Sequence, residues 1–313
     1  MADEQDWARE SLREIALEGI RERRRARRWA IFMRLLFLGV VVTLALFVLR
    51  PGLSTGDGPS GPHTAVVRVD GAIMAGRPAD PARIIRGLEA AFAADSARGV
   101  ILEINSPGGS PVASSRIFQA IERLRSRYPD KPVHAVAGDI MASGAYYVAA
   151  GAEQIHVDGA SIIGSIGVVS RGFGLSDAIE RLGIERRIQT AGDEKAGMDP
   201  FTATTAAEER RLQQMLDDIH AQFIAAVEAG RGGRLRGDPA RLFSGRVWTG
   251  SQSLDNGLAD ALGSPESVAR EVIGAPERVD YTPPRRLLDR ALERIGSAAA
   301  ATWVELQNPL RLH

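Results

Sequence analysis

Short apolar runs alternate with helix-patterned segments between residues 64 and 150. The runs TAVVRVDG, RGVILEIN and PVHAVAG have the length and composition of buried strands. Between them, PARIIRGLEAAFAA and SSRIFQAIERLRSRY have apolar residues at helical spacing, such as Ile117, Ile121 and Leu124. Strands that alternate with helices are joined in parallel by crossover helices. The sequence therefore predicts an α/β domain of parallel strands and crossover helices.

The predicted domain covers residues 64–280, which is long enough for one sizeable hydrophobic core. Before it, residues 50–63 are rich in glycine, proline and serine and predict a flexible linker. After it, residues 281–313 predict an amphipathic helix that carries several arginines. This C-terminal extension has two possible locations. It lies on a membrane or a neighbouring subunit, or it is a solvated helix that packs on its own domain.

An apolar segment near the N-terminus predicts a membrane anchor. Residues 30–49 approach the roughly 20 apolar residues that span a bilayer, and Arg34 is their one charge. The charged segment before it, residues 1–29, contains six clustered arginines: Arg21, Arg23, Arg24, Arg25, Arg27 and Arg28. Such a cluster stays cytoplasmic, which places everything after residue 50 on the far side. A cleaved signal peptide is the alternative, but the long charged region and the lack of an A-x-A site favour an uncleaved anchor.

Composition excludes several classes of function. The formal net charge is zero, so the whole chain gives no electrostatic reason to expect nucleic acid as a partner. The arginine cluster also suits RNA, but its position directly before an apolar span favours a role in membrane topology. There are no cysteines, which excludes disulfides, zinc–thiolate sites and thiol catalysis.

Two glycine-containing turns follow predicted strands. In INSPGGS, Gly108 and Gly109 turn the chain before a helix, where their backbone N–H groups are available to an oxyanion. An ordinary turn has the same sequence. In MASGAYY, Ser143 and Gly144 lie between a strand and a helix, as a nucleophile and a second oxyanion donor do. The alternative for Ser143 is a helix N-cap.

A nucleophilic serine needs a base. None of the five histidines lies in a glycine-rich loop suited to reach Ser143, so a Ser–His–Asp triad is poorly supported; they are His63, His134, His156, His220 and His313. The chain has only two lysines, Lys131 at the start of a strand and Lys195 in the polar loop TAGDEKAGMDP. A desolvated lysine can lose its proton and act as a base, whereas arginine stays charged. Lys195 is therefore the candidate base, and a solvated loop lysine is the alternative.

Four motifs together resemble the bacterial SppA-type signal peptide peptidases. They are INSPGGS, GDIMASGAYYVAAGAEQIHVDGASIIGSIGVVS, TAGDEKAGMDPF and SGRVWTGSQSLDNGLADALG, and the likeness extends from about residue 65 to 275. One anchor and one such domain look like the short form of the family. The resemblance implies a crotonase-like α/β fold related to the Clp protease proteolytic subunit, preceded by one transmembrane helix. It also implies a homo-oligomer, a dome-like octameric ring in which a neighbouring protomer supplies the lysine.

The resemblance assigns roles to individual residues. Ser143 matches the family nucleophile and Lys195 the general base, which gives a Ser–Lys dyad. Gly108, Gly109 and Gly144 match oxyanion-hole positions, and Ser165 in GSIG matches a serine that orients the lysine. One departure is Ala145, which stands where the family motif ASGGYY has a second glycine. Alanine is acceptable there if residue 145 is helical, as we expect, and damaging if it needs a positive φ.

The resemblance implies a serine endopeptidase anchored in the bacterial cytoplasmic membrane, with its catalytic domain facing the periplasm or cell exterior. Its substrates are expected to be cleaved signal peptides or similar apolar peptides, and no metal, nucleotide or organic cofactor is expected. One alternative is a crotonase-type acyl-CoA enzyme, which predicts acidic catalytic residues and a cytosolic chain. The other is a catalytically inactive membrane scaffold, in which Ala145 distorts the nucleophile turn.

Overall fold

The computed structural model describes residues 28–29, 31–43, 61–192 and 194–284. Pro59–Arg285 forms a compact unit that is separate from the rest of the chain. Most of the predicted charged segment, linker and C-terminal extension lies outside the described residues. Residues 31–43 are helical, and the predicted span 30–49 extends past them at both ends. Within the described ranges, no helix is long and apolar enough to cross a membrane.

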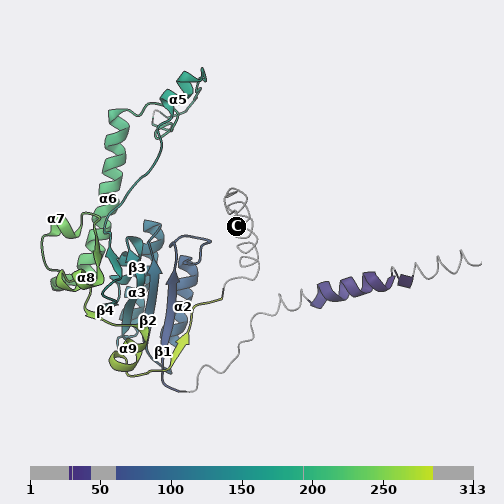
Figure 1. The fold of residues 1–313 in the computed structure, drawn as a ribbon, viewed down its shortest axis with the longest axis vertical. Coiled ribbons are helices and arrows are strands. Elements are labelled where there is room, and N and C mark those ends of the chain that lie inside the picture. Colours follow the sequence, from purple (N-terminus) through teal and green to yellow (C-terminus); the bar gives the residue numbers. More distant parts are fainter. Residues whose placement is uncertain (1–27, 30, 44–60, 193, 285–313) are drawn as a thin grey trace, which may run out of the picture. The chain divides into compact units, whose positions relative to one another are not determined.

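The compact unit is built on a mostly parallel sheet (Figure 1). Its central strands are β1 (His63–Asp70), β2 (Ala97–Ser106) and β3 (Val133–Ala142), paired in parallel as the alternating pattern predicted. The shorter strands are β4 (Gln154–Val157), β5 (Ile162–Gly164), β6 (Val247–Thr249), β7 (Ala261–Leu262) and β8 (Arg278–Asp280). One main path through the sheet runs β6-β5-β3-β2-β1-β8, and β6 is antiparallel to β5.

Three helices cover one face of the sheet: α2 (Pro81–Ala93), α3 (Pro111–Arg127) and α4 (Gly144–Ala149). Asp80 and Ser110 begin the first two by accepting a hydrogen bond from a first-turn N–H, with proline at the first helical position. Alternate residues of β1 to β3 face these helices and form the main core. Val66, Ile101 and Val136 point to the opposite face. The π-helical turn Val268–Val272, which follows α9 (Pro265–Ser267), packs there through Val268 and Ala269.

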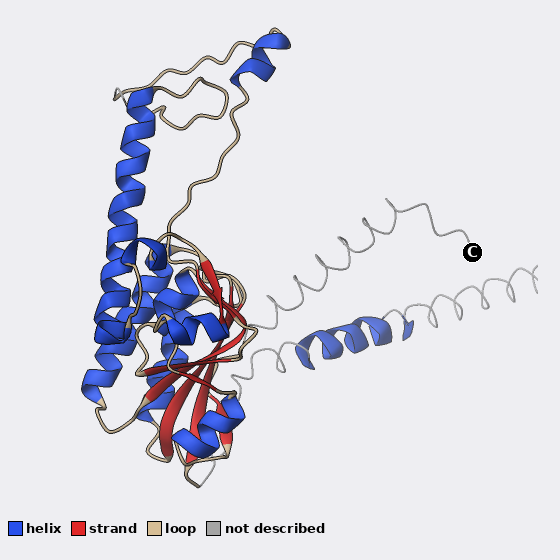
Figure 2. Cartoon of the chain, turned by 60° about the vertical axis from the view of Figure 1, so that its left-hand side comes forward, coloured by secondary structure: helices blue, strands red, loops and turns tan. Residues whose placement is uncertain are grey.

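The longest helix of the described chain, α6 (Ala206–Arg231), begins with a capping box. Thr205 accepts the N–H of Glu208, and the Glu208 side chain accepts the N–H of Thr205. All four buried side chains of α6 are in its C-terminal half: Phe223, Ala226, Val227 and Arg231. Figure 2 shows its first half extending past the sheet toward the short helix α5 (Ser176–Arg181). The remaining elements are a 3₁₀ turn (Gly232–Arg234), α7 (Pro239–Leu242) and α8 (Gly250–Asp255).

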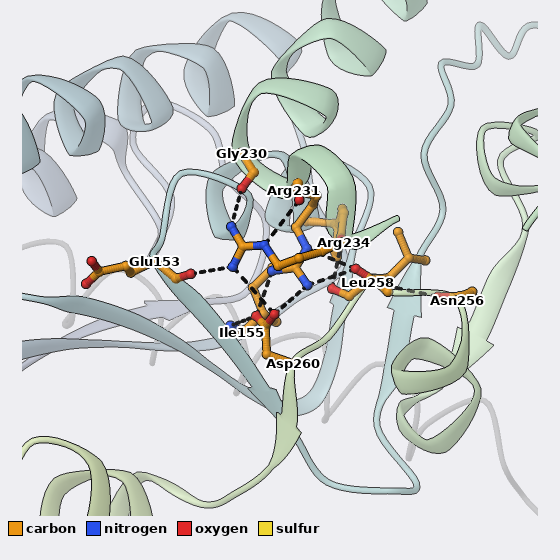
Figure 3. A network of polar contacts seen from close by, with 10 residues as sticks. Glu153, Ile155, Gly230, Arg231, Arg234, Asn256, Leu258 and Asp260 are labelled. Carbon is orange, nitrogen blue, oxygen red and sulfur yellow. Dashed lines mark hydrogen bonds and ion pairs between the residues drawn. The ribbon is translucent and has the colours of Figure 1, made fainter. Parts of the chain in front are cut away.

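A buried ion pair fixes the C-terminal end of α6 (Figure 3). The guanidinium of Arg231, 1% exposed, binds both carboxylate oxygens of Asp260 at 2.6 and 2.9 Å and donates twice to the Gly257 carbonyl. Asp260 also accepts the N–H of Ile155 in β4 at 2.7 Å. The Tyr146 hydroxyl donates to the Leu258 carbonyl beside this pair. The network therefore ties α6 to β4 and to α4, the helix that follows Ser143.

Two buried histidines lie on the second face of the sheet. The rings of His134 in β3 and His156 in β4 are 5.4 Å apart. Burial and the neighbouring His156 lower the pKa of His134 from 6.5 to about 4, against the opposing effect of Asp260. Burial also lowers the pKa of His156. Both rings are therefore neutral in the folded protein near neutral pH.

We expect these histidines to destabilise the protein in acid. In the unfolded chain, His134 becomes protonated below pH 6.5. In the folded chain it stays neutral until about pH 4, so acid favours the unfolded state. A difference of one in pKa is worth about 1.4 kcal/mol, so His134 removes at most about 3 kcal/mol of unfolding free energy across this window. Urea unfolding at pH 7 and pH 4.5 measures the loss, which should be smaller in His134→Gln. Equal losses in both proteins would show that His134 does not carry this dependence.

Candidate active site

Ser143 lies at the end of β3 in a strained conformation. Its φ is 52° and its ψ is −127°, which a residue with a Cβ rarely adopts. Its N–H donates to the Gly164 carbonyl at 2.7 Å, and its side chain makes no capping bond to α4. The N-cap alternative therefore lacks its hydrogen bond. Strain of this kind is concentrated at functional sites, and a sharp strand-to-helix turn exposes a nucleophile.

Two backbone N–H groups without partners lie beside Ser143. Ile73 pairs in parallel with Gly109 by donating to the Gly108 carbonyl and accepting from Ser110, both at 2.9 Å. The N–H of Gly109 therefore points away from Ile73, and a Cβ built on Gly144 would lie 3.2 Å from the Gly109 nitrogen. Within the described part of the chain, neither Gly109 nor Gly144 donates its N–H to a hydrogen bond. The pair can act as an oxyanion hole.

Gly108 shapes the turn instead of donating to a ligand. Its own N–H is occupied by the Ser106 hydroxyl at 3.1 Å. Its φ is +96°, and a Cβ there would lie 2.6 Å from the Gly144 nitrogen and 2.8 Å from the Ser143 Cβ. Only glycine permits this conformation and this close approach. Of the two glycines in the turn, Gly109 is thus the available donor.

Ser165 is the neighbour of Ser143 across two parallel strands. Ala142 of β3 pairs with Gly164 of β5, and each serine follows directly after its strand. Ser165 has a φ of 53°, and its N–H donates to the Arg246 carbonyl at 2.8 Å. Three non-glycine residues of the described chain have positive φ, and the third is Met198. Two strained serines therefore lie side by side at one end of the sheet.

A small, mostly apolar pocket of about 130 Å³ opens beside Ser143. One wall is the segment Gly167–Val169, which follows Ser165, and the other comes from Ile219 and Phe223 of α6. The remaining lining residues are Gly109, Pro111, Ser143, Gly144 and Tyr147. The Tyr147 ring stacks on Phe223 at a centroid distance of 4.8 Å. Phe223 is a pocket wall because of where α6 packs, which the local sequence of this helix does not determine.

Ala145, the departure from the family motif, is the second residue of α4 and is fully buried. It is absent from the residues with positive φ in the described chain. Its expected helical conformation is therefore confirmed. Because alanine favours helix, this residue leaves the Ser143 turn undistorted. The inactive-scaffold alternative loses the structural reason that motivated it.

Lys195 is not beside Ser143 within one chain. It is exposed, in a loop that packs on the first turns of α6 through the Glu194–Arg211 ion pair at 3.1 Å. A helix rises about 1.5 Å per residue, so Arg211 is roughly 12 Å along the axis from the pocket wall at Ile219. The other lysine, Lys131, donates at 2.8 and 2.6 Å to two carbonyls at the end of α2. Lys131 thus has a structural position, and the candidate dyad is incomplete in a single copy.

None of the four described histidines supplies a base in this geometry, and His313 lies outside the described residues. His63 binds the Tyr281 hydroxyl, and His134 and His156 are on the second face. His220 is nearest the site, but its Nε2 is bonded to the Ile166 carbonyl at 3.2 Å. Across the described ranges, no three His, Asp or Glu side chains are grouped to hold a metal ion.

The chain is similar in sequence to a peptidase family, to a putative peptidase and to part of an antiporter. Residues 125–274 match peptidase family S49. A putative signal peptide peptidase SppA from Enterococcus faecium is 31% identical over 54% of this chain and 48% of that protein. A Na(+)/H(+) antiporter NhaA from Brucella abortus is 42% identical over 74% of this chain but only 32% of that protein. The chain therefore spans about a third to a half of these two relatives.

A solved structure is similar in outline. It is a lysine-to-alanine mutant of the 1510-N membrane-bound stomatin-specific protease in complex with a substrate peptide. The sequence identity is 16%, the TM-score is 0.44, and the match covers 75% of this chain and 98% of that one. The assignment depends on the sequence matches, and residues 125–274 include the strained turn at Ser143. The sequence matches therefore group residues 125–274 with the SppA-type proteases of peptidase family S49.

Proposed function

We propose that this protein is a membrane-anchored serine endopeptidase that cleaves apolar peptides through Ser143 and Lys195. The observation that carries the proposal is the geometry at Ser143. A strained serine with no capping bond lies next to two N–H groups that have no partner in the described chain. This is the arrangement that acyl transfer requires, because the nucleophile and the oxyanion donors must meet at one carbonyl.

The proposed reaction begins when the Ser143 hydroxyl attacks the peptide carbonyl carbon and passes its proton to the neutral amine of Lys195. The carbonyl oxygen becomes an oxyanion that accepts hydrogen bonds from the N–H groups of Gly109 and Gly144. The intermediate collapses as the C–N bond breaks, and Lys195 returns the proton to the leaving amine. Water then attacks the acyl-enzyme, with Lys195 taking a proton from the water and returning it to the Ser143 oxygen.

The lysine is proposed to come from a neighbouring copy. The loop that holds Lys195 packs on the first turns of α6, and Lys195 does not line the pocket beside Ser143 of its own chain. This loop belongs to a segment with large exposed apolar side chains. Phe173 is 85% exposed, Leu182 73% and Met198 59%. Side chains of this kind favour burial against another surface. A ring of copies, octameric as the resemblance implies, would cover them and remove the water that keeps the lysine charged.

The membrane location follows from the apolar segment 30–49 and the arginines before it. We propose one span in the bacterial cytoplasmic membrane, with the peptidase unit in the periplasm or outside the cell. Signal-peptide remnants are apolar and are released into that membrane, and the pocket beside Ser143 is mostly apolar. Among the described residues that line this pocket, none is acidic, which disfavours the acyl-CoA alternative.

The test is hydrolysis of a fluorogenic apolar peptide by the full chain in detergent. Because proton transfer by a positioned base contributes about 10²- to 10⁴-fold, Lys195→Arg should lose at least about a hundredfold in turnover. Lys131→Arg is the matched control, because arginine keeps the donors that Lys131 uses, and it should stay near the wild type. Equal turnover by both variants would reject Lys195 as the base. No hydrolysis by the wild-type oligomer would reject the peptidase.

A further inference from the structure

His220 joins the two walls of the pocket beside Ser143. Its ring is half-buried on α6, next to Ile219, and its Nε2 lies 3.2 Å from the carbonyl oxygen of Ile166. Ile166 comes directly after Ser165 and directly before the opposite wall, Gly167–Val169. A carbonyl oxygen only accepts hydrogen bonds, so the ring must present Nε2–H to it. The Nε2–H group is therefore used in a hydrogen bond to the backbone.

We propose that His220 is a positioning residue that sets the width of the substrate pocket by holding α6 against the segment that follows Ser165. The inference deepens the proposed peptidase function and rests on it for the identity of the substrate. His220 itself does not act on the reacting atoms. It acts through the two walls, which contact an apolar side chain of the peptide.

The contacts on each wall explain why this bond matters. Backbone bonds and core packing hold the far side of the segment after Ser165. The N–H of Gly245 donates to the Ile166 carbonyl at 3.0 Å, Ser165 donates to Arg246 at 2.8 Å, and the Ile166 side chain is fully buried in the core. On the side of α6, the side-chain hydrogen bond that this segment accepts within the described chain comes from His220. Without it, that side keeps only van der Waals contacts.

The position of His220 along α6 strengthens the argument. All four buried side chains of this helix lie C-terminal to His220, the first being Phe223. Ile219, the other wall residue on α6, lies N-terminal to it and is only half-buried. The hydrogen bond from His220 thus fixes the part of the wall that core packing does not reach.

The chemistry of the bond predicts the kinetic signature. A pocket of unfixed width binds the ground state and the transition state of the peptide less well by the same factor, which raises KM and leaves kcat unchanged. One net hydrogen bond corresponds to about a threefold to tenfold change. A general base would behave differently, because its loss lowers kcat and removes a limb of the pH–rate profile.

The experiment compares three variants of the full chain: His220→Leu, His220→Gln and the control Gln222→Leu, an exposed position on the same helix. We expect His220→Leu to raise KM about threefold to tenfold, with kcat within about twofold. Glutamine keeps a side-chain N–H donor, so His220→Gln should recover most of the loss, and Gln222→Leu should match the wild type. The pH–rate profile should keep its shape in all three variants.

Hydrogen exchange of the amides at 166–169 gives a readout that needs no substrate. Exchange there should be faster in His220→Leu than in His220→Gln or the control. Unchanged exchange and unchanged KM in His220→Leu would overturn the inference while leaving the peptidase intact. A large loss of kcat in both His220 variants, with loss of a pH limb, would instead make His220 the base. If the wild type cleaves no peptide, the proposed function fails. Hydrogen exchange alone then decides whether the bond from His220 holds the segment after Ser165.

Discussion

Replacing Ser143 by alanine is expected to lower kcat/KM for an apolar peptide at least about a thousandfold, because the variant lacks the hydroxyl proposed to form the acyl-enzyme. The backbone contacts of Ser143 use its N–H and carbonyl, which alanine keeps. The strain at its positive φ is similar for both side chains, so the variant should fold and assemble. The loss therefore reports on chemistry and not on stability.

The matched control is Ser126→Ala on the exposed surface of α3, whose kcat/KM should stay within about twofold of the wild type. Thermal unfolding of the Ser143 variant should lie close to that of the control. If Ser143→Ala retains a tenth or more of the wild-type activity while the control is normal, Ser143 is not the nucleophile. Ser165, the other strained serine at this end of the sheet, would then be the next candidate.

Arg231→Met is expected to lower the unfolding free energy by about 3 to 5 kcal/mol, the usual cost of breaking a buried ion pair from one side. Burial raises the pKa of Asp260, but its bonds to Arg231 and to the Ile155 N–H outweigh this and hold the pKa below its usual value. Without Arg231, the largely buried Asp260 carboxylate keeps only the more exposed Arg234 as an ion-pair partner in the described chain, at 3.5 Å. The Gly257 carbonyl also loses both of its guanidinium donors.

Urea unfolding measures this effect against Arg123→Met, which breaks an exposed ion pair with Glu89 at 3.5 Å. That control should change the unfolding free energy by at most about 1 kcal/mol. Removing both charges, in Arg231→Met with Asp260→Asn, should cost less than the sum of the single changes, because no charge is left unpaired. An Arg231→Met protein as stable as the control would mean that the network in Figure 3 contributes nothing to the fold.

Local patterns in the sequence were sufficient for the central fold and for the serine turn. Strands β1 to β3 are long apolar runs next to amphipathic helices, so their type and parallel pairing follow from pattern alone. The turn at Ser143 and the turn at Gly108 lie at the ends of neighbouring strands, β3 and β2, which brings them to one edge of the sheet. The sequence could therefore predict that the turns at Ser143 and Gly108 lie together.

Contacts between distant segments could not be predicted in the same way. The antiparallel strand β6 has three residues, Val247–Thr249, too few for a periodic signal. The bond from His220 to Ile166 joins residues 54 positions apart, and nothing in their local sequences encodes it. The separation of Lys195 from Ser143 depends on the length of α6, and the resemblance to known peptidases was the only source for a lysine from another copy.

The most direct test of the account is co-expression of Ser143→Ala and Lys195→Ala with two different affinity tags. Oligomers that carry both tags contain intact serines on one kind of protomer and intact lysines on the other. If a neighbouring copy supplies the lysine, random mixing should leave about a quarter of the sites complete, so mixed oligomers should recover roughly a quarter of the wild-type rate. Mixed oligomers as inactive as either single variant would contradict a site shared between copies.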